Sequence, residues 1–172
     1  MTTVSMSAGW LINSELTAQA SVGVILDGTL KTRAREVHTV EPGGLVALGA
    51  EYLAREGEGA RPFVNISFVI GSSWTETKDP DSGVKTSYTA VDARLGARAG
   101  WALGENLFPF VAARVFGGPV KWQWDDQDVT GTDVHHYQLA LGTAVRIDAL
   151  GLWVEWAGVG EQALGAGLST SW

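Results

Sequence analysis

Apolar and polar residues alternate at every second position along most of this chain. The clearest segment, residues 87–101, has one apolar face that ends in an aromatic residue and one face with three charges. The apolar face consists of Ser87, Thr89, Val91, Ala93, Leu95, Ala97, Ala99 and Trp101, and the charges belong to Asp92, Arg94 and Arg98. Residues 62–74 and 137–148 follow the same scheme. A period of two residues predicts β-strands with two chemically different faces.

Segments rich in turn residues separate these strands, and short connections alternate with long ones. Short connections are expected at 56–59, 104–106 and 148–151, and longer polar ones at about 27–36, 75–86 and 123–133. The last connection, 160–162, is short but falls at the long-loop end. This alternation predicts an all-β fold, a closed antiparallel up-and-down barrel with tight turns at one end and loops at the other. We expect residues 1–172 to form this single barrel domain.

The number of strands depends on how the N-terminal part is interpreted. Trp10, Ile12, Leu16 and every second residue from Ala18 to Leu26 keep one parity, so residues 8–26 can form one long strand. That interpretation gives eight strands. If residues 13–15 are a turn and residues 29–40 a strand, the barrel has ten. We expect eight, because residues 29–40 carry charges on both faces and offer no apolar one.

Alternation alone does not say which face meets water, because a soluble lipocalin-like barrel turns its apolar face inward and a transmembrane barrel turns it outward. The polar faces carry a nearly balanced set of charges, which a closed lumen could pair with one another. These residues are Glu51, Arg55, Asp92, Arg94, Arg98, Arg114, Arg146, Asp148 and Glu155. We expect Arg94 and Arg98 to be partners of Asp92 and Glu155. The balance favours a transmembrane barrel with a lumen filled by side chains.

Aromatic residues lie near the ends of the expected strands, where membrane interfaces favour them. They are Trp10, Trp74, Trp101, Phe108, Phe110, Trp122, Trp153 and Trp172. The chain ends on Trp172, with Leu164, Ala166, Leu168 and Thr170 on the same face. Two segments, 59–64 and 105–111, place a proline and an aromatic residue where a strand would re-enter the membrane.

In these features the sequence resembles the small outer-membrane β-barrels of bacteria, the OmpA-like and OmpX-like transmembrane barrels. The resemblance covers nearly the whole chain from about residue 8, and it is one of pattern. It implies a location in the bacterial outer membrane and contact with phospholipid and lipopolysaccharide. It also implies that the outer-membrane assembly machinery reads the C-terminal strand ending at Trp172. The first residues lack the basic region and apolar stretch of a secretory signal.

Composition excludes several classes of function. The chain has no cysteine, so disulfides and cysteine-based metal or redox sites are not available to it. Its formal net charge of -7 argues against nucleic acid as a partner, because phosphate binding needs a basic surface. No segment approaches the twenty apolar residues of a transmembrane helix.

Three polar segments are candidates for chemistry, and each also fits a solvated loop. Loop 121–133 contains Asp125, Asp126, Asp128 and Asp133, which could bind calcium but lack the spacing of an EF-hand. His135 and His136 follow Asp133, yet adjacent strand residues point to opposite faces and cannot form one two-histidine site. Lys31, Arg33 and Arg35 alternate, so they could meet lipopolysaccharide phosphates at the loop rim.

We therefore expect a non-enzymatic outer-membrane barrel, without cofactor or catalytic residues and monomeric, that stabilises the membrane or displays loops for adhesion or partner binding. The alternative is a soluble lipocalin-like barrel that binds an apolar ligand. An outer-membrane enzyme with a site at the rim is a further alternative.

Overall fold

The computed structural model describes residues 1–31, 37–80, 82–124, 127–132 and 136–170. Twelve strands make up almost all of this part of the chain, and it contains no helix. The strands are β1 (Thr2–Leu11), β2 (Leu16–Lys31), β3 (Val37–Val40), β4 (Gly43–Arg55), β5 (Phe63–Lys78), β6 (Lys85–Gly100), β7 (Leu107–Gly117), β8 (Val120–Trp124), β9 (Gln127–Gly131), β10 (Tyr137–Ile147), β11 (Leu150–Gly160) and β12 (Ala163–Thr170). Among the described residues, no helix is long and apolar enough to cross a membrane.

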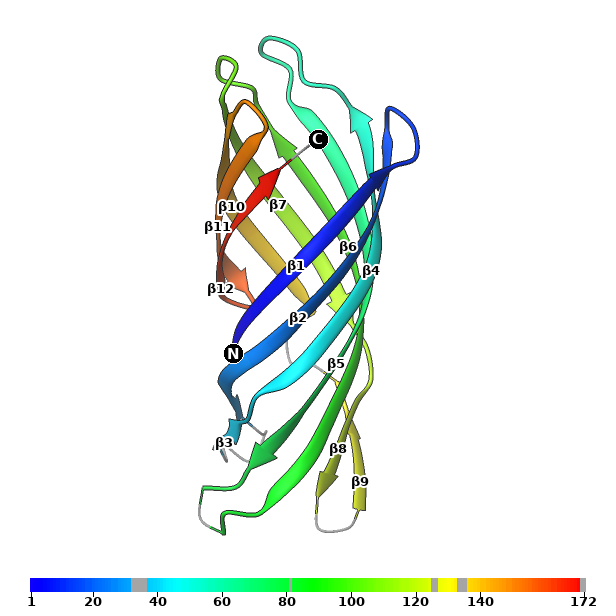
Figure 1. Cartoon of the computed structure of the whole chain (residues 1–172), viewed down its shortest axis with the longest axis vertical. Coiled ribbons are helices and arrows are strands. Elements are labelled where there is room, and N and C mark those ends of the chain that lie inside the picture. The colour runs from blue at the N-terminus through cyan, green and yellow to red at the C-terminus, as the bar shows by residue number, and fades with distance from the viewer. Residues whose placement is uncertain (32–36, 81, 125–126, 133–135, 171–172) are drawn as a thin grey trace.

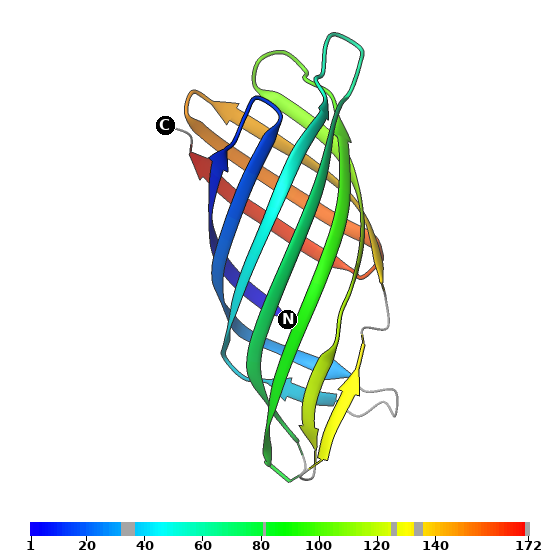
Figure 2. The same cartoon turned by 90° about the vertical axis from the view of Figure 1, so that its right-hand side faces the viewer.

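All strand pairs are antiparallel, and the sheet curls into an elongated barrel (Figures 1 and 2). The wall follows the order β1-β2-β4-β5-β6-β7-β10-β11-β12, because β4 pairs with both β2 and β5. β3 pairs with the ends of β2 and β5, and β8 pairs with the start of β6 and with β9. The predicted all-β class and antiparallel barrel are thus confirmed.

The N-terminal interpretation is wrong, because residues 8–26 form two strands with a turn between them. Asn13 Oδ1 accepts hydrogen bonds from the backbone N–H groups of Glu15 (2.9 Å) and Leu16 (2.8 Å), which fixes the turn. In the β1–β2 ladder, Trp10 lies opposite Ala18 and Ala8 opposite Ala20. Each strand therefore puts the same parity on the same face, so alternation passes through the turn unbroken. The described residues occupy nine positions in the wall, neither eight nor ten.

The connections separate the barrel into two different ends. The connections 12–15, 56–62, 101–106 and 148–149 lie together at the end that is uppermost in Figure 1, which we call the turn end. At the opposite loop end, two of the long loops predicted from sequence are largely paired strand. Thr75–Lys78 pairs with Lys85–Tyr88, and β8 pairs with β9. The β2–β3 hairpin crosses beneath the barrel at this end (Figure 2).

Outward and inward positions alternate along each wall strand, as the ladders require. The outward positions are apolar and open to the surroundings: Leu48 is 63% exposed, Leu95 52% and Leu141 57%. The buried core of the barrel wall is small and consists of Phe110, Ala112, Ala140 and Ala157, with Phe63 packed against it. The chain thus places its apolar side chains on the outside of the barrel.

The two end strands of the wall are each paired on one side only. Among the described residues, β1 pairs with β2 and β12 pairs with β11, and no ladder joins β1 to β12. Because eight antiparallel pairings lead from β1 to β12 along the wall, the two strands run in the same direction. Figure 1 shows the two strands facing each other across the front of the barrel, along what we call the seam.

Candidate functional site

The lumen collects most of the charged residues of the barrel wall. Facing pairs in the ladders set which side chains point inward: Asn65 lies opposite Arg98, and Arg114 opposite both Gly96 and Gln138. Outward neighbours such as Ala97 and Val115 carry no charge. Seven of the nine predicted charges face the lumen, namely Glu51, Asp92, Arg94, Arg98, Arg114, Arg146 and Glu155.

The strongest ion pair in the lumen joins Arg114 on β7 to Glu155 on β11. Both guanidinium nitrogens donate to the carboxylate, Nη1 at 2.5 Å and Nη2 at 2.6 Å. Nη1 also donates to Gln138 Oε1 at 2.9 Å, and Gln138 in turn donates to the carbonyl oxygen of Glu161. The two charged side chains are only 17% and 13% exposed. This bidentate pair ties three adjacent strands together from inside.

Two further carboxylates have partners in the lumen. Glu51 accepts a hydrogen bond from Asn65 Nδ2 at 2.6 Å. Asp92 lies 3.8 Å from Arg94, two positions further along the same strand, and both side chains are well exposed. The predicted pairing of Arg94 with Asp92 is confirmed. The predicted pairing of Arg98 with Glu155 is wrong, because the partner of Glu155 is Arg114.

Two of the predicted charges do not belong to the lumen network. Asp148 is exposed in the tight turn between β10 and β11, where its φ of 53° is one that aspartate tolerates better than most residues. Arg55 is exposed at the end of β4, beyond the irregularity at which the β4–β5 register shifts. For these two positions the assignment to the lumen is wrong, because the inward alternation ends before them.

The other two lumen arginines lie over aromatic rings. The Arg98 guanidinium is 4.6 Å from the centre of the Phe110 ring, and that of Arg146 is 5.7 Å from the centre of the Phe108 ring. Arg98 has no carboxylate within salt-bridge distance among the described residues, nor does Arg146. Both face the turn end of the lumen. Among the described residues, this end therefore holds two arginines without an ion-pair partner.

A cavity of about 620 Å³ occupies the turn end of the lumen. Its walls come from both sides of the barrel, and the side chains that define its chemistry are Phe63, Phe108, Phe110, Trp153, Arg98 and Arg146. Glycines leave room for the rings: a Cβ on Gly142 would come within 2.3 Å of Phe110, and one on Gly100 within 2.5 Å of Phe63. A smaller polar cavity of about 190 Å³ lies deeper, with Arg98 and Asn65 lining both. The lumen is thus less completely filled than the sequence predicts.

The loop end of the lumen is packed instead. Ile25, His38 and Thr77 are almost completely buried there. The Trp122 indole donates from Nε1 to Thr77 Oγ1 at 2.8 Å, and its ring meets His38 edge-on with centroids 4.9 Å apart. Asp79 lies 3.8 Å from His38 Nδ1. These contacts join the β2–β3 hairpin to β5 and β8, so the loop end is covered.

The predicted interface aromatics divide between the two faces. Trp10 and Trp74 point outward and are about half exposed, and Trp101 is exposed at the turn end, donating from Nε1 to the carbonyl of Ala60 at 3.2 Å. The prediction of an outer position is wrong for Phe108, Phe110, Trp122 and Trp153, which face inward. Trp172 lies outside the described residues. The outward Trp156, 58% exposed, was not predicted.

A sequence signal for the inward aromatics exists, although the prediction did not use it. Phe108 and Phe110 share the parity of Arg114, and Trp153 shares that of Glu155. On a strand, shared parity means a shared face. An aromatic residue in register with lumen charges therefore belongs to the lumen, even near a strand end.

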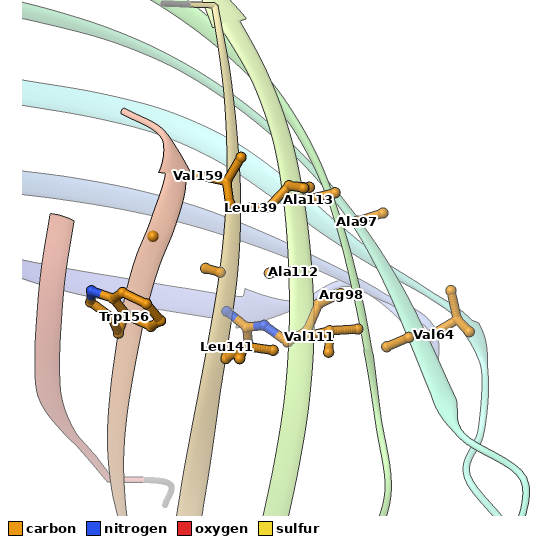
Figure 3. Close-up of a pocket in the computed structure, with 13 residues that line it drawn as sticks. Val64, Ala97, Arg98, Val111, Ala112, Ala113, Leu139, Leu141, Trp156 and Val159 are labelled. Atoms are coloured by element: carbon orange, nitrogen blue, oxygen red, sulfur yellow. The ribbon is translucent and has the colours of Figure 1, made fainter. Parts of the chain in front are cut away.

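An apolar hollow of about 500 Å³ lies on the wall formed by β6, β7, β10 and β11. Small outward residues, Ala97, Ala99 and Ala113, leave it between larger ones. Figure 3 shows Val111, Leu141 and Trp156 on successive strands along its side. The hollow lies among outward-facing apolar side chains.

The polar loop candidates are only partly placed. Asp125, Asp126, Asp133 and His135 lie outside the described residues, as do Arg33 and Arg35. His136 Nδ1 lies 3.3 Å from the carbonyl oxygen of Phe116. Within the described part of the chain, no three His, Asp or Glu side chains are grouped so that they could hold a metal ion.

Comparison of this chain with protein-family models, with curated proteins and with solved structures finds no match. The fold and the lumen therefore define the protein only as an antiparallel β-barrel with an apolar exterior and a charged interior.

Proposed function

We propose that this chain is a small transmembrane β-barrel of the bacterial outer membrane, which serves a structural role or displays its loop end to partners and is not an enzyme. The observation that carries the proposal is the inverted arrangement of the barrel, with its apolar residues outside and its charges inside. A lipocalin-like binder of apolar ligands needs the opposite arrangement, and a water-soluble monomer rarely exposes so much continuous apolar surface.

The height of the apolar exterior supports the proposal. On β5 the outward residues are apolar or small from Val64 to Trp74, and the next two outward residues are Glu76 and Lys78. On the neighbouring β6 the change falls between Thr89 and Ser87, followed by Lys85. The stretch 64–74 matches the roughly 9–11 residues with which a tilted strand crosses a bilayer.

Aromatic residues and the last strand add to the proposal. Trp74 lies on β5 just before the outward residues become charged, and Trp10 and Trp101 lie at the turn-end termini of β1 and β6. Such positions suit amphipathic rings at the two interfaces. The outward residues of β12, Leu164, Ala166, Leu168 and Thr170, fit the pattern of the outer-membrane barrel resemblance. In that resemblance β12 is the segment that the assembly machinery reads. In the proposed membrane setting, lipid fills the hollow beside Trp156.

Cysteine scanning tests the proposal cleanly, because the chain has no cysteine of its own. Single cysteines at Val91 and Leu95 report on the outward face, and cysteines at Ser67 and Ser73 are matched inward controls. Spin labels at 91 and 95, in lipid, should be relaxed by oxygen and shielded from a water-soluble nickel complex. A label at 76 should be reached by the nickel complex.

The expected result is therefore a clear difference in nickel accessibility between positions 91 and 95 and position 76. If the nickel complex reaches labels at 91 and 95 as readily as the label at 76, the outward face is in water and the membrane proposal fails.

A further inference from the structure

We infer that the turn-end cavity of the lumen is a binding site for a small aromatic carboxylate. The cavity lies inside the barrel, so this inference goes beyond the proposed function and does not depend on what surrounds the outer face. It rests on the walls of the cavity, on its two arginines and on its position.

The walls favour a flat apolar body. Phe63, Phe108, Phe110 and Trp153 bring four aromatic side chains to one space of about 620 Å³. That volume is within the roughly 300–1,000 Å³ of ordinary small-molecule sites. Aromatic rings stack in offset or edge-to-face arrangements, so a ligand ring can continue the packing of these side chains.

The charges favour an oxyanion on that body. Arg98 and Arg146 both line the cavity, and each lies against an aromatic ring, with no carboxylate partner among the described residues. The one acidic residue in the cavity wall, Glu56, is exposed in the turn at the rim. A cation–π contact uses none of the hydrogen-bond donors, so the N–H groups of each guanidinium remain for a carboxylate, which they match bidentately.

The position of the cavity favours entry from the turn end. The loop end is covered by the packed contacts of His38, Thr77 and Trp122, whereas Arg146 is exposed at the turn end. The cavity is therefore a vestibule that reaches as far as Arg98 and Asn65, where the smaller polar cavity begins.

Titration calorimetry of the folded full chain in detergent tests this site, with protein-free detergent as the blank. The probes are 2-naphthoate, its neutral counterpart 2-naphthamide and the cation 2-naphthylmethylamine. We expect saturable binding of 2-naphthoate. The amide should bind at least about tenfold more weakly, because a charge-assisted contact is lost. An amide or amine that binds as well as the naphthoate would overturn the assignment.

Variants separate binding in the cavity from non-specific attraction of the naphthoate to exposed arginines. R146Q and R98Q should each weaken 2-naphthoate binding about tenfold, and Ala144→Phe should abolish it by filling the cavity without changing any charge. R61Q is the matched control, because Arg61 is an exposed arginine of the same end that does not line the cavity. Circular dichroism and mobility on an unheated gel establish that each variant is folded. Folded R98Q, R146Q and Ala144→Phe variants that bind like the original chain would refute the inference.

Discussion

The two ends of the lumen are built from the same alternating strands, but one end is tightly packed and the other encloses a cavity. At the loop end, Ile25 and Thr77 are at most 1% exposed, and Trp122 donates a hydrogen bond to Thr77. At the turn end, large rings lie over glycines, and a cavity of about 620 Å³ remains beside Arg98 and Arg146. Strand alternation decides which side chains enter a barrel, but their volumes decide whether the interior becomes a core or a site.

The largest expected effect comes from truncating the packed end. Ile25→Ala removes a side chain that is 1% exposed and should lower the free energy of unfolding by about 2–5 kcal/mol, because a cavity remains behind. Leu26→Ala is the control, since Leu26 lies next to Ile25 but on the outward face and is 46% exposed. Urea unfolding followed by tryptophan fluorescence measures both. Equal losses for the two variants would mean that the loop end is not a packed core.

An intermediate loss of stability is expected from breaking the Arg114–Glu155 ion pair, which lies between the two ends of the lumen. Arg114→Leu leaves the shielded Glu155 without its bidentate partner and should cost about 3 kcal/mol, the lower limit for breaking a buried pair, since both groups keep some solvent contact. Arg94→Leu should cost less than about 1 kcal/mol, because the Asp92–Arg94 pair is largely exposed. The same unfolding measurement applies, and a larger loss for Arg94→Leu would reverse the ranking of the two pairs.

The smallest expected change in stability comes from enlarging alanine side chains on β10, a strand that contributes to both the packed core and the cavity. Ala140 and Ala144 both face the lumen on β10, but Ala140 is buried in the small core and Ala144 lines the cavity. Ala140→Phe should cost about 1–3 kcal/mol through overpacking, whereas Ala144→Phe should change stability by less than about 0.5 kcal/mol. Thermal unfolding midpoints of the two variants give the comparison. Equal destabilisation would show that the turn end has no free space.

The sequence predicts well which side chains of each strand point into the barrel. It predicts poorly which of the inward charges form ion pairs with one another, and the reason is physical. Alternation is local, so the inward charges of residues 87–101 can be assigned without knowing any neighbouring strand. The partner of Glu155 depends on the register of β7 and β10 against β11, which no local pattern contains.

The turn at residues 12–15 escaped prediction for a related reason. In the β1–β2 hairpin, opposite residues have equal parity, so the apolar row continues from Trp10 to Ala18 as if the chain ran straight. The evidence for the turn is chemical instead, in the side-chain oxygen of Asn13 that accepts two backbone N–H groups. The inward position of Phe108 and Phe110 could also have been predicted from the sequence. Both residues share the parity of Arg114 and therefore its face, although they lie near a strand end.

The seam gives the turn-end cavity a wall that is held less firmly than the rest. Trp153 and Ser169 line the cavity from β11 and β12, and among the described residues β12 has a hydrogen-bonded neighbour on one side only. Moving β12 disturbs one ladder, whereas moving any strand from β2 to β11 in the wall disturbs two. Trp153 faces inward yet is 41% exposed, which is consistent with this incomplete cover. Local opening of β12 is therefore expected to cost less free energy than opening of the other wall strands, and it would widen the edge of the cavity.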